Sequence, residues 1–281
     1  DYGISSQMSR GLVLPNGRGL WGDQLLQIGV VSDDPAGAAQ GQAIADYAAG
    51  LGGEVPVELQ TAPPPDTVSI PLLASSHHAF PLGRRDVSGD LVEVSIEHHG
   101  FVVSGPPRSG RTTALRNIAT SLIAAGHQVW SIGLGDALGG TGRHCGPKVA
   151  EAGELLDELA TLCEALPGDR PYVLIVDDVD RYEEAMEVSM PYERIVKTEE
   201  CVLIGACETN NLSGYTQSAL IGDLRKQPSK MLLRPENASE IMQYTNARAQ
   251  LRPGFQLSAG RGVLVVDREA SLVQVGAEFE T

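Results

Sequence analysis

Short apolar runs alternate with longer amphipathic stretches through most of the chain. The runs have the length of buried strands, and the longer stretches repeat their apolar residues at the spacing of helices. The predicted strands cover 91–96, 100–104, 128–132, 172–176, 202–206 and 230–233. The predicted helices cover 110–125, 149–166, 182–187, 215–224 and 239–246. This alternation predicts an α/β fold with a mostly parallel sheet and helices on both of its faces.

A similar glycine-rich pattern occurs near both ends of the chain. Gly17-Arg18-Gly19-Leu20 leads into Leu25-Leu26-Gln27-Ile28-Gly29, and Gly260-Arg261-Gly262-Val263 leads into Leu272-Val273-Gln274-Val275-Gly276. The second copy has four more residues between its halves, which we expect to lengthen the turn. Coincidence between two glycine-rich hairpins is the alternative. The shared order of features favours a true repeat of tandem modules.

The repeat divides the chain into three parts. We expect residues 1–32 to be the closing hairpin of a preceding module. Residues 33–73 contain a predicted helix from Asp34 to Leu51, followed by an extended linker with Pro63-Pro64-Pro65. We expect residues 74–281 to form one complete module. The lack of an initial Met agrees with a piece cut from a longer chain of such modules.

Composition narrows the class of protein. Apolar residues make up 42% of the 281 residues, but no apolar run approaches the roughly 20 residues of a membrane span. No basic region followed by an apolar run marks a signal peptide at Asp1. The formal net charge of −15 argues against nucleic-acid binding, because proteins that bind duplex DNA usually carry a basic surface. The four cysteines form no zinc-type pair, so we expect reduced thiols in a cytosolic protein.

The most specific motif follows the predicted strand at 100–104. It runs Gly105, Pro106, Pro107, Arg108, Ser109, Gly110, Arg111, Thr112, Thr113 and opens a predicted helix. This matches the phosphate-binding pattern G-x-x-x-x-G-K-[ST], with an arginine where lysine is expected. The two glycines let backbone N–H groups turn toward phosphates, and Thr112 is placed to bind Mg²⁺. A glycine and proline turn before a helix is the alternative, which the strand context disfavours.

Arg111 is the departure that bears on chemistry. The lysine of this motif reaches the β- and γ-phosphates as a compact point charge, whereas arginine is planar and donates through a fixed fork. We therefore expect weaker stabilisation of the transition state, with nucleotide binding partly retained.

A second acidic motif follows the apolar run Tyr172-Val173-Leu174-Ile175-Val176. An acid at the end of such a strand holds Mg²⁺ in phosphoryl-transfer enzymes, and Asp177 takes this position. Asp178 stands where a catalytic acid would polarise the attacking water, although aspartate is one methylene shorter than glutamate. An acidic turn after a core strand is the alternative.

Other polar groups are weaker candidates. Glu208 follows the strand at 202–206, where a γ-phosphate sensor would lie, but its charge would repel a triphosphate. Arg225 and Lys226 could reach a neighbouring module's nucleotide, although a basic helix end is the preferred interpretation. The pairs His77-His78 and His98-His99 make no metal site by themselves, because neighbours in a strand point to opposite faces.

Together these motifs resemble an ATPase module of the FtsK/SpoIIIE family. The resemblance covers about 70–278 and includes the phosphate-binding loop, Asp177-Asp178, the strand end near Glu208 and the closing Gly260-Arg261-Gly262 element. It implies a RecA-like P-loop NTPase fold of the ASCE type, with ATP and Mg²⁺ as cofactors. Tandem modules are typical of the EccC/EssC-type motors of type VII secretion, in which later modules often have degenerate sites.

The resemblance implies a nucleotide-binding module of a protein-translocation motor, with degenerate Walker A (Arg111) and Walker B (Asp178) motifs. Such a module is expected to bind ATP with little or no hydrolysis and to act in regulation or substrate docking. Its expected partners are neighbouring ATPase modules and small helical secreted proteins, at the cytosolic face of a membrane complex. The membrane would be reached only through another part of the full-length protein. A DNA-translocating ATPase and a nucleotide-free docking module are the alternatives.

Overall fold

The computed structural model of the chain describes residues 18–21, 24–27, 34, 37–50, 67–86, 88–97, 99–135, 138–140, 142–165, 172–212, 218–247 and 257–280. The chain divides into two compact units, Asp1–Thr61 and Ala62–Thr281. The first unit contains the hairpin β1 (Arg18–Trp21) and β2 (Gln24–Gln27) and the helix α2 (Gly37–Gly50). The helix predicted over 34–51 is therefore observed. The predicted linker lies outside the described residues up to position 66.

The two glycine-rich copies form hairpins with the same pairing. Arg18 pairs with Gln27 in the first unit, as Arg261 pairs with Gln274 between β12 (Arg261–Val266) and β13 (Glu269–Val275). The expectation of a longer turn in the second copy is wrong. Its last pair is Val266 with Glu269, so a two-residue turn remains and the extra residues lengthen both strands. Asp267 and Arg268 both have positive φ, as tight hairpin turns require.

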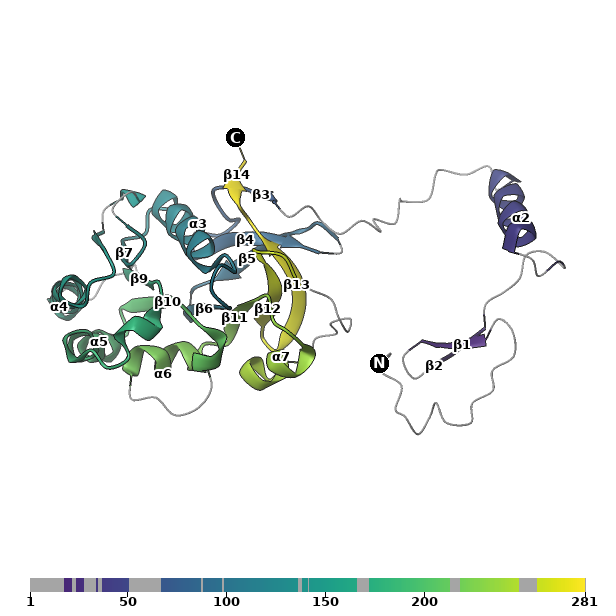
Figure 1. Cartoon of the computed structure of the whole chain (residues 1–281). Coiled ribbons are helices and arrows are strands. Elements are labelled where there is room, and N and C mark those ends of the chain that lie inside the picture. Colours follow the sequence, from purple (N-terminus) through teal and green to yellow (C-terminus); the bar gives the residue numbers. More distant parts are fainter. Residues whose placement is uncertain are drawn as a thin grey trace. The chain divides into compact units, whose positions relative to one another are not determined.

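The second unit is built on a sheet of ten strands in the order β5-β4-β13-β12-β11-β6-β10-β9-β7-β8 (Figure 1). The strands from β11 to β8 pair in parallel, and the four strands on the other side pair antiparallel. The strands not yet given are β4 (Ala79–Arg85), β5 (Leu91–Ser95), β6 (Phe101–Ser104), β7 (Val129–Ile132), β8 (His144–Cys145), β9 (Tyr172–Val176), β10 (Cys201–Cys207) and β11 (Ser229–Leu233). The predicted α/β fold is confirmed.

Helices cover both faces of this sheet and create two cores. On β6, Phe101 and Val103 belong to the core beneath α3 (Arg111–Ala124), while Val102 belongs to the core beneath α4 (Val149–Ala165) and α6 (Ala219–Lys226). Successive residues of a strand point to opposite faces, so a fully buried apolar strand supplies both cores. A smaller core lies beneath α7 (Ala238–Thr245).

One helix differs from its prediction. The helix expected at 182–187 is instead the short 3₁₀ turn η2 (Val179–Tyr182), followed by α5 (Met186–Thr198). Pro191 lies inside α5, where an interior proline costs about 3 kcal/mol. Burial of Val188, Tyr192 and Ile195 in the core shared with α4 offsets that cost. The first residues of the helix predicted at 215–224 lie outside the described part of the chain, and α6 begins at Ala219.

Strands β3 (Ser69–Ile70), β4 and β14 (Glu278–Phe279) were not predicted from the sequence pattern. The β4 run contains Pro81 and Gly83, which usually weaken a strand, and its pairing with β5 is irregular between these two residues. Ser69 and Ile70 lie in the predicted linker but pair in parallel with β14. Another 3₁₀ turn, η3 (Thr209–Leu212), follows β10.

Candidate functional site

The loop from Gly105 to Gly110 connects the central strand β6 to α3. Ser109 N–H donates to the Pro106 carbonyl at 3.2 Å, which turns the loop back on itself. Two of its residues adopt left-handed backbone angles, Arg108 with φ 62° and Gly110 with φ 106°. The loop therefore has the compact curvature that lets backbone groups surround an anion.

Close packing explains both glycines of the motif. A Cβ atom on Gly105 would lie 2.6 Å from Ser109 Oγ and 2.8 Å from the Leu233 carbonyl oxygen. A Cβ atom on Gly110 would approach Gly260 N to 3.2 Å. Gly260 N–H donates to the Ser109 carbonyl at 2.8 Å. The closing glycine-rich element therefore contacts the predicted phosphate-binding loop directly.

The start of α3 is open to an acceptor. Its N-cap residue, Gly110, provides no side-chain hydrogen bond to the first turn. The first N–H groups of a helix lack partners within the helix and attract anions. Pro106 and Pro107 have no N–H group, so the donors of this site come from the later part of the loop and from the helix start.

Thr112 and Asp177 meet at the carboxyl edge of the sheet. Strand β10 lies between β6 and β9, so the loop after β6 and the acids after β9 lie one strand apart. The Thr112 hydroxyl donates to Asp177 Oδ2 at 2.6 Å. Asp177 is buried, and its burial raises the pKa of its carboxyl group, with the nearby Asp178 charge acting in the same direction. The two predicted Mg²⁺ ligands therefore lie together.

Arg111 forms an ion pair with Asp178. Its Nη2 atom donates to Asp178 Oδ1 at 2.9 Å, and the two side chains are 11% and 45% exposed. Arg181 approaches the other Asp178 oxygen at 4.0 Å. Asp178 has a φ of 47°, so its backbone is also in the left-handed region. The residue at the lysine position is thus held by the residue at the predicted catalytic position.

The residues present fit a nucleotide with Mg²⁺. Arg111 Nη1 and Ser109 Oγ are buried in the loop without a hydrogen-bond partner among the described residues. Both can donate to phosphate oxygens, and both lie beside the open start of α3. Thr112 and Asp177 supply the oxygen ligands that Mg²⁺ prefers. The assignment of these residues to ATP and Mg²⁺ remains a prediction.

Asp180 is a site residue that the sequence patterns did not single out. Its Oδ2 atom accepts from the Glu208 N–H at 2.9 Å and so joins the ends of β9 and β10. Burial raises the pKa of its carboxyl group. The only sequence signal was a third acid after β9. Through this bond Asp180 fixes the backbone at Glu208, where β10 ends and the turn with Thr209 begins.

Arg225 is occupied inside its own module. Its guanidinium donates to the Asn211 carbonyl from Nε at 2.9 Å and from Nη2 at 2.6 Å. Lys226 is exposed and pairs with Asp223. This agrees with the preferred interpretation of a basic helix end, and Arg225 ties α6 to η3.

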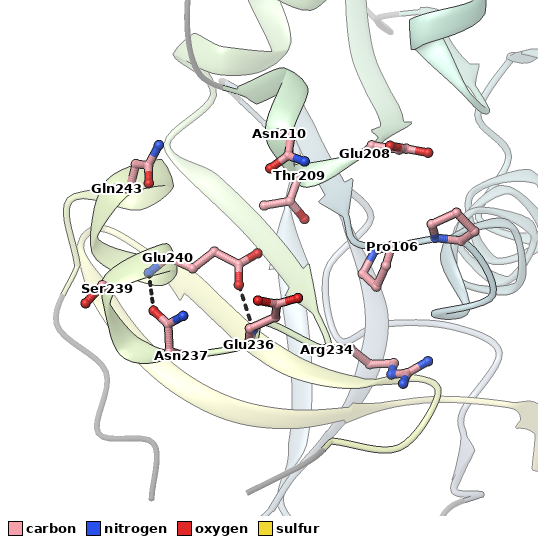
Figure 2. Close-up of a pocket in the computed structure, with 11 residues that line it drawn as sticks. Pro106, Glu208, Thr209, Asn210, Arg234, Glu236, Asn237, Ser239, Glu240 and Gln243 are labelled. Carbon is pink, nitrogen blue, oxygen red and sulfur yellow. Dashed lines mark hydrogen bonds between the residues drawn. The ribbon is translucent and has the colours of Figure 1, made fainter. Parts of the chain in front are cut away.

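A pocket of about 620 Å³ opens beside the loop, between the ends of β10 and β11 and the start of α7 (Figure 2). The labelled acids Glu208, Glu236 and Glu240 and the base Arg234 all line it. Three carboxylates against one guanidinium disfavour phosphate there. Phosphate therefore fits the loop and the start of α3 better than this pocket.

The comparisons with known proteins identify the fold. No protein family and no curated protein matches the sequence. ATPase domains 2 and 3 of Thermomonospora curvata EccC, solved with a signal sequence peptide, match 96% of this chain at 17% identity and a TM-score of 0.65. ATPase domains 2 and 3 of Geobacillus thermodenitrificans EssC match 90% at 15% identity and a TM-score of 0.59. The chain spans 54% and 53% of those two chains, about half of each.

A third solved structure has a different cellular setting. The pCW3 conjugation coupling protein TcpA, in its monomer form with ATPγS, matches 76% of this chain at 12% identity and a TM-score of 0.54. The chain covers 70% of TcpA. Within the described part of the chain, no helix has both the length and the apolar content needed to cross a membrane. The chain shares the mostly parallel α/β fold of these solved structures, as its alternation of strands and helices predicted.

Proposed function

We propose that this chain is a nucleotide-binding module of a multi-module protein-translocation motor of the type VII secretion kind. It binds ATP with Mg²⁺ and hydrolyses it slowly or not at all. The observation that supports this proposal is the ion pair between Arg111 and Asp178.

The ion pair affects both the activation of the attacking water and the stabilisation of the transferring phosphate. A general base must reach the proton of the attacking water, and a carboxylate that accepts from a guanidinium is less available for that role. Arg111 in turn gives one of its terminal nitrogens to Asp178 instead of to the transferring phosphate. Slow turnover follows from these two losses together.

Binding has separate support. The open start of α3, Ser109 Oγ and Arg111 Nη1 are donors to phosphate oxygens, and Thr112 with Asp177 would hold Mg²⁺. A bound Mg²⁺ ion supplies charge neutralisation of the phosphates. Nucleotide binding thus needs neither Asp178 as a base nor lysine at position 111.

The module would regulate a neighbouring ATPase module and dock the secreted substrate. The partners would be neighbouring ATPase modules and small helical secreted proteins, at the cytosolic face of a membrane complex. The shared fold with EccC and EssC supports a multi-module motor. The net charge of −15 argues against a nucleic-acid cargo, although the TcpA fold is also similar.

The test is a titration of the chain with a fluorescent ATP analogue and Mg²⁺, together with Arg111→Ala and a phosphate-release assay. We expect micromolar binding in the parent, at least about tenfold weaker binding in the variant, and almost no phosphate release. Absence of binding at millimolar nucleotide would leave only the nucleotide-free docking module. Hydrolysis that duplex DNA stimulates would replace the proposal with DNA translocation.

A further inference from the structure

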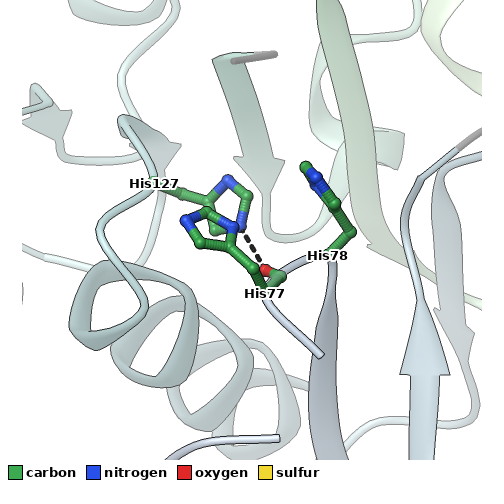
Figure 3. A group of neighbouring side chains, drawn as sticks. All are labelled: His77, His78 and His127. Carbon is green, nitrogen blue, oxygen red and sulfur yellow. Dashed lines mark hydrogen bonds between the residues drawn. The ribbon is translucent and has the colours of Figure 1, made fainter. Parts of the chain in front are cut away.

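Three histidines from separate parts of the second unit lie together. His77 and His78 precede β4, and His127 lies between α3 and β7. Figure 3 shows the three side chains gathered at one place. Each offers one ring nitrogen, and the three nitrogens lie within 4.8 Å of one another. The ring centroids are 4.5 Å apart for His77 and His127, 5.1 Å for His77 and His78, and 5.9 Å for His78 and His127.

The backbone places each ring by a local hydrogen-bonded turn. His77 and His78 are the central residues of a turn closed by Ala79 N–H donating to the Ser76 carbonyl at 3.2 Å. They are therefore not in a strand, and their side chains need not point to opposite faces. The sequence-based argument against a site at this pair used strand geometry and does not apply here.

A helix end places the third ring. Gly126, with φ 91°, donates to the Ile123 carbonyl, and His127 N–H donates to the Leu122 carbonyl at 3.0 Å. These two bonds are those of a Schellman motif, which fixes the residue after the glycine. His127 is buried at 1% exposure, so its ring has little freedom.

Hydrogen bonding also sets the tautomer of His127. Its Nε2 atom lies 2.7 Å from the His77 carbonyl oxygen. A carbonyl oxygen can only accept, so Nε2 carries the hydrogen, and the neutral ring has its lone pair on Nδ1. Metal-binding histidines commonly donate their other ring nitrogen to a carbonyl in this way. His78 Nδ1 is buried and has no hydrogen-bond partner among the described residues.

We propose that His77, His78 and His127 bind a divalent transition-metal ion of the zinc class. Neutral imidazoles suit zinc, cobalt, nickel and copper, and three of them leave a fourth position for water or another ligand. In a tetrahedral site with Zn–N bonds of about 2.05 Å, two ligand nitrogens lie about 3.4 Å apart. The histidine nitrogens lie within 4.8 Å of one another, so side-chain rotations must shorten each distance by at most about 1.4 Å.

The bound metal ion would cross-link two segments. One is the segment that leads into β4, and the other is the turn after α3. The site lies at the opposite end of α3 from the phosphate-binding loop, so it is independent of the proposed nucleotide chemistry. Because an ion that binds only the folded chain stabilises it, metal binding should raise the melting temperature.

The experiment compares the whole chain with variants of the cluster. His78→Ala removes one ligand at a half-buried position. His127→Gln removes the lone pair of Nδ1 but keeps an amide that can donate to the His77 carbonyl. His99→Ala is the matched control, since His99 is exposed and outside the cluster. Zinc affinity is measured by competition with a chromophoric chelator, cobalt coordination by absorption, and stability by circular-dichroism melting with and without zinc.

We expect the parent and His99→Ala to bind zinc with the same affinity. For both proteins, zinc at about 100 times its Kd should raise the melting temperature by about 5 °C or more relative to the metal-free protein. His78→Ala and His127→Gln should each bind zinc at least about tenfold more weakly while melting like the parent without metal. Cobalt should give a tetrahedral spectrum without a thiolate charge-transfer band. Equal zinc affinity in the parent and in His78→Ala overturns the proposal, as does a thiolate band, which would place the ion at the cysteines.

Discussion

Asp178→Asn provides the sharpest test of how the ion pair controls the site. Under the proposed function, the Asp178 carboxylate competes with phosphate for Arg111, so loss of its charge should free the guanidinium for nucleotide. We expect the affinity for Mg²⁺–ATP to rise and any residual hydrolysis to fall. A site in which Asp178 acted only as a catalytic base would lose turnover with no gain in affinity.

The structure sets the magnitude. A hydrogen bond between charged groups contributes about 1.5–3 kcal/mol, and the Arg111–Asp178 distance of 2.9 Å is that of a good one. Asp178 is 45% exposed, however, and surface ion pairs contribute at most about 1 kcal/mol. The upper end of that surface range, about 1 kcal/mol, corresponds to an affinity gain of about fivefold. The unfolding free energy without nucleotide should fall by about the same amount.

Competition must be separated from general charge repulsion. Asp178→Asn also removes a negative charge near the phosphates, which would favour binding without Arg111. The assay is therefore a double-mutant cycle of Asp178→Asn and Arg111→Ala, read by fluorescence titration. Glu208→Gln is the charge-matched control, since it removes a nearby charge that does not contact Arg111. If Asp178→Asn raises the affinity equally with and without Arg111, the competition argument is refuted.

Three further predictions concern the loop, the metal ligands and a buried lysine. Gly110→Ala should lower the unfolding free energy measured in urea titrations by about 1–3 kcal/mol, because Gly110 has a φ of 106°. The control Gly222→Ala lies in α6 with open space around it and should not lower this free energy. Thr112→Val should remove the hydroxyl that donates to Asp177, cost about 1 kcal/mol of stability and abolish the Mg²⁺ dependence of nucleotide binding measured by titration. Burial lowers the pKa of Lys230 from 10.5 to about 8. Below about pH 8 the buried lysine is charged and destabilises the parent relative to Lys230→Met. Between about pH 8 and pH 10.5 the folded parent releases this proton before the unfolded chain does, so its relative stability rises. Urea unfolding of both proteins at pH 7 and pH 10 should show a relative gain on the order of 1–3 kcal/mol, and no gain would mean that backbone hydrogen bonds keep the lysine charged.

Most elements of the second unit followed from local pattern. Phe101–Ser104 is a short, mainly apolar run that Gly105 follows, and Arg111–Ala124 repeats its apolar residues at helical spacing. Such patterns report which faces of a strand or helix are buried, so they predict an element from its own residues. The pattern was least informative at β4 and α5, where Pro81 and Pro191 suggest interruption and only packing against neighbours decides otherwise.

The residues of the candidate nucleotide site could also be selected from the sequence, although their role stays a prediction. The spacing of Gly105, Gly110 and Thr112 is a local requirement of a loop between a strand and a helix. The acids after β9 were identified because they follow an apolar strand. Their meeting with Thr112 depended on the strand order, which places one strand between β6 and β9.

Only the tertiary structure decided which charged groups face each other. The sequence identified Arg111 and Asp178 as separate departures, but their ion pair joins residues 67 positions apart. The histidine cluster likewise joins residues 50 positions apart, and its convergence depends on a turn and a helix end. The physical reason is that periodicity and spacing describe neighbours along one element, whereas electrostatics and metal coordination act through space between elements that the sheet brings together.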